Sequence, residues 1–307
     1  MSRTAILFPG QGAQVVGMGR RLMESTPETV RSEVVKLYET ASQILGYDLA
    51  NVCLAGPAER LNSTAVSQPA IFVTSLAAAK VLEVENPTLR SDCAFVAGLS
   101  LGEYTALAYA DAIDFEAGVR LVKCRGEAMQ AAADAIPSGM VSVLGFDREK
   151  VESLIATCRE GETLEIANLL CPGNIVVSGT KAACLRMTKA AQEAGAMGVI
   201  PLTVAGAFHT KIMEPATRKL AEIVDATEFR CARIPVVSNV DATAHTTPEE
   251  FRALLKRQIV SPVLWEDTMR WLLAQNCEQF YEAGPGRVLQ GLLKRISRKT
   301  ACGGIDV

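Results

Sequence analysis

The sequence of 307 residues has little of several features that mark whole classes of protein. Its net charge is only -3, from 31 Lys and Arg against 34 Asp and Glu, so it lacks the positive field that nucleic-acid binding needs. Two histidines and no C-x-x-C pair leave few ligands for a metal. No apolar run approaches the roughly 18 residues of a membrane span. We therefore expect no nucleic-acid, metal, cofactor or membrane partner.

Cysteine is present but follows no pattern. An odd set of nine, scattered singly, indicates thiols that stay reduced in a cytosol-like compartment. The N-terminus enters the apolar residues 5–8 at once, without the leader that export requires. We expect a cytoplasmic protein, or one of the plastid stroma if a leader has been removed.

Alternating strand and helix signals define the fold class. Residues 5–8 are apolar and end at Pro9 and Gly10, which indicates a buried strand and a tight turn. Residues 92–98 predict a second buried strand, and residues 103–110 are rich in helix formers. Strand, turn and helix in this order predict an α/β protein with a parallel-sheet core.

Residues 139–204 have a different arrangement, with strand and helix patterns in the order β-α-β-β-α-β. This order is typical of a ferredoxin-like unit. Buried-strand and helix patterns resume at residues 235–238. We therefore predict a large hydrolase-like α/β domain, residues 1–134 and 204–307, with a small ferredoxin-like subdomain inserted at residues 135–203.

A G-x-S-x-G motif lies between the predicted strand at 92–98 and the helix after it. In that context the sharp turn forces Ser100 into a strained backbone conformation, which Gly98 and Gly102 make sterically possible. The Ser100 hydroxyl would then project from the end of the strand, with the Leu101 amide available to an oxyanion. We interpret Ser100 as a nucleophile; the alternative is an ordinary serine in a glycine-rich turn.

A serine nucleophile needs a base, and the chain offers only His209 and His245. His209 follows an apolar run and can face a cleft from the end of a strand. His245 lies in a polar stretch before a helix start, which is typical of a surface loop. We favour His209, although taken alone it would be read as a core histidine.

The helix predicted at residues 115–134 carries an arginine on its apolar side. At about 100° per residue, Arg125 falls between Leu121 and Val122. The other charged side chains share the opposite, solvated face: Glu116, Arg120, Lys123, Glu127 and Asp134. A buried arginine requires a negative partner, which is either an internal carboxylate or the carboxylate of a ligand. Met129, one turn further on, would line the same wall.

Two other segments have weaker signals. The glycine pair around Gln11 has Val15 where a dinucleotide loop needs its third glycine, so we expect a turn that aims a backbone N–H into a cleft, with that of Gln11 as the candidate. Near the C-terminus stands a basic cluster, which is either a solvated helix face or a docking site for an acidic partner: Lys294, Arg295, Arg298 and Lys299.

An ordered series of motifs runs through nearly the whole chain: FPGQGAQ at 8–14, SQPA at 67–70, GLSLGEYTAL at 98–107, RGEAMQ at 125–130, AFHTKIMEPA at 207–216, SNVDA at 238–242, RQIVSPVLWE at 257–266 and YEAGPGRVLQGLLKRI at 281–296. This series resembles the malonyl-CoA:acyl carrier protein transacylases of type II fatty acid synthesis and, more distantly, polyketide synthase acyltransferase domains. The resemblance implies a hydrolase-like core, a ferredoxin-like subdomain and a cleft between them.

The same resemblance implies roles for individual residues. It makes Ser100 the nucleophile, His209 the base and Arg125 the partner of the free malonyl carboxylate. Oxyanion amides would come from Gln11 and Leu101, and the remaining neighbours would orient His209 or crowd a branched acyl group: Gln258 and Phe208. Many relatives have His where Leu99 stands and Asn where Leu170 stands, the latter on the CoA side of the cleft.

The implied reaction is a ping-pong transfer of malonyl from malonyl-CoA to the phosphopantetheine thiol of an acidic acyl carrier protein. It passes through a malonyl ester on Ser100 and supplies fatty acid chain elongation. Three alternatives stay open at this point: a polyketide-type transferase of another acyl group, a serine esterase, and a carrier-binding scaffold without activity.

Overall fold

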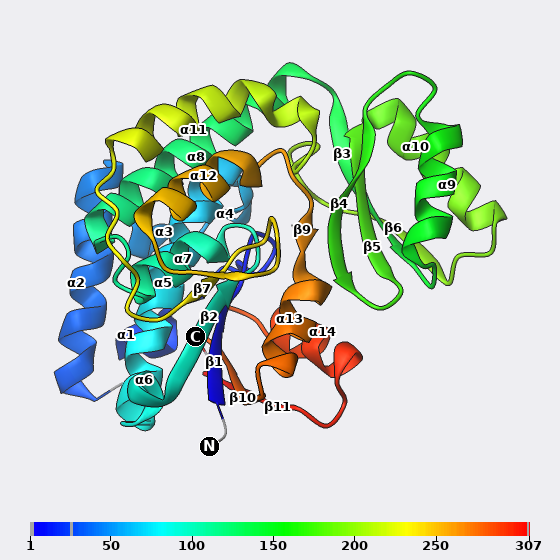
Figure 1. Cartoon of the computed structure of the whole chain (residues 1–307). Helices are drawn as coiled ribbons and strands as arrows, with labels where there is room; N and C mark the ends of the chain where they lie inside the picture. The colour runs from blue at the N-terminus through cyan, green and yellow to red at the C-terminus, as the bar shows by residue number, and fades with distance from the viewer. Residues whose placement is uncertain (1–2, 25–26, 306) are drawn as a thin grey trace.

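The computed structural model describes residues 3–24, 27–305 and 307, whose strands form two sheets (Figure 1). The six-stranded sheet has the order β11 (Ala301–Gly304), β10 (Cys277–Glu282), β1 (Arg3–Phe8), β2 (Cys93–Gly98), β7 (Val236–Val237) and β8 (Ala244–His245). Every neighbouring pair is parallel except β7 with β8. The predicted parallel core is confirmed.

Helices cover both faces of this sheet, because its central strands are apolar on both sides. Along β1, Ile6 and Phe8 face one apolar cluster, whereas Ala5 and Leu7 face the other. The larger cluster lies under α2 (Glu28–Leu45), α5 (Thr64–Glu85), α7 (Gly102–Tyr109), α8 (Phe115–Ala135), α11 (Glu214–Ala226) and α12 (Pro248–Gln258). The smaller one lies under α13 (Trp265–Ala274) and α14 (Val288–Ile296).

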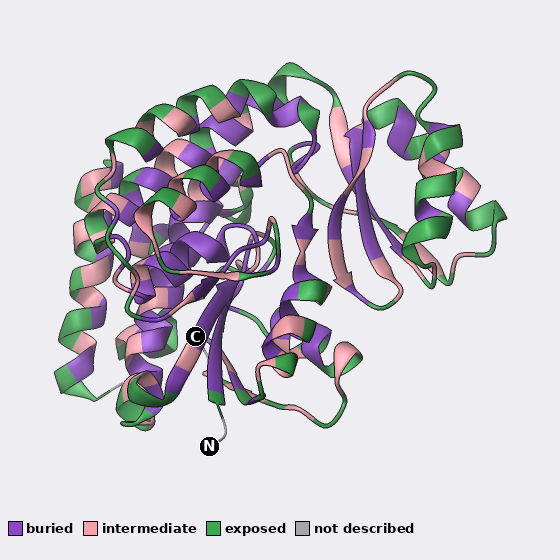
Figure 2. Cartoon of the chain, viewed as in Figure 1, coloured by how far each residue is buried: buried purple, intermediate pink, exposed green. Residues whose placement is uncertain are grey.

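The remaining helices are short and connect these layers: α1 (Arg20–Glu24), α3 (Leu49–Ala55), α4 (Ala58–Asn62), α6 (Leu89–Asp92) and the 3₁₀ turn η1 (Lys211–Met213). Figure 2 shows buried residues concentrated in β1, β2 and the helices around them.

Helix α5 corrects one expectation from the sequence. By length and composition it could cross a membrane, although we expected no run of that size. However, 78% of its apolar window is buried inside the fold, where it packs against α2, α7 and α8. It is apolar over most of its surface because it is a central core helix.

The second sheet has the order β6 (Gly198–Pro201), β3 (Ser138–Leu144), β5 (Asn174–Thr180), β4 (Leu164–Cys171) and β9 (Val263–Leu264). With α9 (Arg148–Cys158) and α10 (Lys181–Glu193), the first four strands form the predicted β-α-β-β-α-β unit, so this part of the fold class is also confirmed. Its fifth strand, β9, comes from outside the inserted segment and pairs with β4 in parallel. Figure 1 shows this unit to one side of the large sheet.

Candidate active site

Ser100 lies at the sharp turn between β2 and α7, as the motif predicts. Its φ of 53° is in the left-handed region, which costs energy for any residue with a side chain. The flanking glycines permit the turn: a Cβ on Gly98 would lie 1.8 Å from the carbonyl carbon of Gly102, and one on Gly102 would lie 2.1 Å from the Phe8 oxygen. Ser100 is 9% exposed, so most of the residue is shielded from solvent.

Asn239, just after β7, holds this turn from both ends. Its Oδ1 accepts from the Ser100 N–H at 2.6 Å, and its Nδ2 donates to the Gly98 carbonyl at 2.7 Å. Asn239 lies within the SNVDA motif, which predicted no role for it. Because the side chain satisfies two buried backbone groups of the strained turn, it fixes the position of Ser100.

His209 faces the Ser100 hydroxyl. Its Nε2 lies 2.9 Å from Oγ, and its Nδ1 lies 3.0 Å and 3.1 Å from the main-chain carbonyls of Gln258 and Ser261. Only an Nδ1–H can bond two carbonyls, so Nε2 carries the lone pair. Burial, followed by the charge of Arg125, lowers the pKa of His209 to about 4, which keeps the ring neutral at physiological pH.

Arg125 lies on α8 with only 1% of its surface exposed, as the helical periodicity predicts. Its Nη2 lies 3.0 Å from both Ser100 Oγ and Gln258 Oε1, and its Nη1 donates to Gln68 Oε1 at 2.8 Å. Among the described residues no carboxylate oxygen lies within 4.0 Å of the guanidinium, so the alternative of a direct internal ion pair is wrong. Burial lowers the pKa of this cation, against smaller opposing effects of Tyr104 and Glu103.

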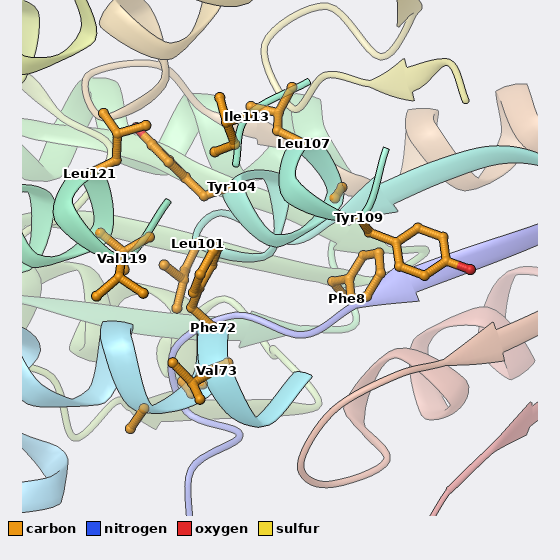
Figure 3. Close-up of a cluster of buried hydrophobic side chains, with 14 of the residues drawn as sticks. Phe8, Phe72, Val73, Leu101, Tyr104, Leu107, Tyr109, Ile113, Val119 and Leu121 are labelled. Atoms are coloured by element: carbon orange, nitrogen blue, oxygen red, sulfur yellow. The ribbon is translucent and has the colours of Figure 1, made fainter. Parts of the chain in front are cut away.

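Beside Arg125 lies Tyr104, which belongs to a buried apolar cluster. Figure 3 shows Leu101 and Tyr104 in one cluster with Phe72 and Leu121. The Arg125 Cζ lies 5.2 Å from the centre of the Tyr104 ring, a cation-π contact.

Glu103 is a second buried ionisable residue near the site, and no sequence pattern indicated it. Its Oε2 accepts from Gln258 Nε2 at 2.7 Å and from the Asn239 N–H at 3.1 Å, and burial raises its pKa. Gln258 thus contacts His209 through its main-chain carbonyl, while its side chain joins Arg125 to Glu103 and also donates to the Ser100 carbonyl at 2.9 Å. Because Glu103 lies inside the motif that starts helix α7, no separate sequence signal indicated its role.

Four other residues were predicted at the site. Leu101 is fully buried, and Gln11, part-buried, donates from its side chain to Thr64 Oγ1 at 3.4 Å. Within residues 3–24, 27–305 and 307, no acceptor bonds the amide of Leu101 or Gln11. Both amides are therefore free to donate to a ligand oxygen. Met129 and Phe208 are buried at 1% and 5% exposure.

Two predicted features lie apart from these residues. His245 is in strand β8 rather than a loop, and its side chain is 15% exposed between Asp241 and Glu250, at 3.0 Å and 3.1 Å. The basic cluster is exposed, and three of its members line a surface hollow of about 380 Å³ with Gly291: Lys294, Arg295 and Arg298. In the described part of the chain, no group of three or more His, Cys, Asp or Glu could hold a metal.

Residues 6–302 match the model of the acyl transferase domain family, so the chain belongs to this family. The malonyl CoA-acyl carrier protein transacylase of Bacillus subtilis is 40% identical over 301 residues, which cover 97% of this chain and 92% of that protein. The human mitochondrial malonyl-CoA-acyl carrier protein transacylase is 40% identical over 303 residues, covering 95% and 76%.

Solved structures agree. The acyl carrier protein S-malonyltransferase of Vibrio cholerae superposes with a TM-score of 0.92 at 39% identity, over 100% of this chain and 98% of that one. A malonyl-transacylase in complex with its type II polyketide acyl-carrier protein gives 0.92 at 37% identity, over 100% and 97%. The resemblance stated from the sequence motifs is confirmed.

Proposed function

We propose that this chain transfers malonyl groups from malonyl-CoA to the phosphopantetheine thiol of an acyl carrier protein, through a malonyl ester on Ser100. The observation that carries the proposal is the buried guanidinium of Arg125, 3.0 Å from Ser100 Oγ and without a direct carboxylate partner. An acyl group with a free carboxylate completes that pairing, whereas acetyl leaves the cation unpaired.

The hydrogen bonds set the direction of proton transfer. Ser100 Oγ accepts from Arg125, so its own hydrogen is directed to the lone pair on His209 Nε2. His209 removes this proton as Oγ attacks the thioester carbonyl, and then returns it to the CoA thiolate as the tetrahedral intermediate collapses. The two main-chain carbonyls at Nδ1 fix the ring, so the pair works without a triad carboxylate.

The oxyanion of the intermediate is held by the free amides of Leu101 and Gln11, and such donors are typically worth 10²- to 10³-fold each in rate. In the second half-reaction the carrier thiol gives its proton to His209 and attacks the Ser100 ester, which restores the free hydroxyl. Phe208, buried beside His209, restricts the space at the α-carbon and disfavours branched acyl groups.

The exposed cluster of Lys294, Arg295, Arg298 and Lys299 is the docking site of the acidic carrier protein. The known complex of a similar transacylase with its carrier protein supports a carrier as the second substrate. All nine cysteines are unpaired, which supports a reducing, cytoplasmic location.

The test is to mix the protein with malonyl-CoA and measure its intact mass. We expect one malonyl adduct in the wild type, located on Ser100 by peptide mapping, and none in Ser100→Ala. Acetyl-CoA and neutral esters run in parallel distinguish a transferase of another acyl group and an esterase. A malonyl adduct that persists in Ser100→Ala would overturn the assignment of the nucleophile.

A further inference from the structure

The groups that hold Arg125 in place are all electrically neutral. Its guanidinium contacts the amide oxygens of Gln68 and Gln258, the Ser100 hydroxyl and the face of Tyr104. Burial raises the pKa of Tyr104 to about 12, so this ring is neutral too. The arginine is therefore positioned by its neighbours without being neutralised by them.

Of these groups, Gln68 has no role in the proposed reaction so far. It lies on α5, where it is fully buried. Helices α5 and α8 approach closely at this level, since a Cβ on Gly126 would lie 2.7 Å from the Thr64 carbonyl oxygen. That approach places Gln68 Oε1 at 2.8 Å from Arg125 Nη1.

The two amides differ in what their NH₂ groups do. Gln258 Nε2 donates to Glu103 and to the Ser100 carbonyl, so a carboxylate at position 258 would face a second buried carboxylate. Among the residues that the structure describes, Gln68 Nε2 meets only the Met129 sulfur at 3.5 Å, a weak acceptor. A glutamate at position 68 would therefore lose little on that side and would pair directly with Arg125.

We propose that Gln68 is a specificity-determining residue: its neutral amide holds the Arg125 guanidinium beside Ser100 and leaves its charge for the carboxylate of the acyl substrate. The inference rests on the proposed malonyl transfer and deepens it. Glu103 acts on the charge of Arg125 electrostatically but makes no direct ion pair with it, because the Gln258 side chain lies between them, so it does not take the contact that the substrate carboxylate would make. An acid in place of Gln68 would be a permanent competitor.

The experiment compares acylation of the enzyme by malonyl-CoA and by acetyl-CoA in Gln68→Glu. We expect the ratio of kcat/KM for malonyl over acetyl to fall at least about tenfold, with the loss mainly in a higher KM for malonyl-CoA. Gln68→Met is the neutral control of similar size, and it should slow both substrates while keeping most of their ratio. Gln192→Glu adds the same charge on the exposed surface of α10 and should leave the ratio unchanged.

The outcomes decide whether Gln68 determines substrate specificity or has only a structural role. A wild-type ratio in Gln68→Glu, or an equal loss in Gln68→Met, would overturn the inference. Thermal unfolding adds a second measurement, because a carboxylate beside an unneutralised cation should make Gln68→Glu at least as stable as Gln68→Met. A Gln68→Glu variant that fails to fold, or melts below Gln68→Met, contradicts the proposal.

A measurement on the wild type needs no variant. Malonate should raise the melting temperature of the protein more than malonamide, its neutral analogue, and equal shifts would overturn the idea of an unneutralised Arg125. The proposed function fails separately, when the wild type itself forms no malonyl adduct. A wild type that forms the adduct while Gln68→Glu keeps its selectivity refutes only the role of Gln68.

Discussion

The depressed pKa of His209 predicts how acid affects the stability of this protein. In the folded chain this pKa is about 4, against 6.5 for an unperturbed histidine. As the pH falls from 6.5 to about 4, the unfolded chain therefore takes up a proton that the folded chain refuses, and folding is weakened. This shift in the pKa of His209 corresponds to about 3 kcal/mol of the free energy of unfolding, which is present above pH 6.5 and is lost as the pH approaches 4.

The wild type alone would not reveal this effect, because Glu282 acts in the opposite direction. Burial raises the pKa of Glu282 to about 7, so the folded chain holds that proton first and gains stability as the pH falls from about 7. The informative quantity is the difference between wild type and His209→Asn, in which the contribution of Glu282 cancels. We expect urea unfolding to show this difference falling by about 3 kcal/mol between about pH 7 and pH 4.

The same comparison, with and without His209→Asn, can be made in a protein that carries Arg125→Met, which tests the second cause of the low pKa. The charge of Arg125 is the second cause of the low pKa of His209, after burial. In the Arg125→Met background the pKa should rise part of the way toward 6.5, so the same difference should shrink. A difference that stays flat with pH, or grows as the pH falls, would refute a neutral, buried base.

Two further predictions concern residues that the first does not touch. Asn239→Ala leaves the Ser100 N–H and the Gly98 carbonyl buried without partners, at a cost of about 1 to 3 kcal/mol each, so the free energy of unfolding should drop and the burst of malonyl-enzyme should slow. Asn239→Asp keeps the acceptor for the Ser100 N–H and should restore part of the rate. An unchanged burst in Asn239→Ala would contradict the role of Asn239 in holding the turn. Reversing Lys294 and Arg295 to Glu should raise the KM for carrier protein about tenfold at low salt and leave that for malonyl-CoA unchanged, whereas equal changes in both would dismiss docking at this face.

Local patterns in the sequence predicted the backbone of the site. The turn at Ser100 follows from two glycines between a buried strand and a helix, and the burial of Arg125 follows from the period of α8. Both features depend on residues within a few positions of one another. This is the range over which periodicity and steric constraints act.

The frame around those residues was not predictable in the same way. Asn239 contacts Ser100 across 139 positions, and Gln68 contacts Arg125 across 57. A buried amide on an apolar helix or at the end of a short strand has no periodic signal, and its partners become apparent only when the sheet and helices are assembled. The sequence and the family resemblance therefore predicted that Ser100, His209, Arg125 and Gln258 share one site, but gave no role to Asn239 or Gln68.

The site contains several features that lower the free energy of unfolding. Ser100 and His209 both have positive φ values, 53° and 61°, and Arg125 is buried without direct neutralisation. Strain of this kind persists only where the surroundings overdetermine it, and here Asn239 and Gln258 supply that constraint with hydrogen bonds to the turn. A substitution that relieves one cost, such as an acid placed against Arg125, should stabilise the fold while neutralising the charge that we propose selects the substrate. Stability and selectivity are therefore opposed at the same guanidinium, which explains why neutral amides rather than carboxylates surround it.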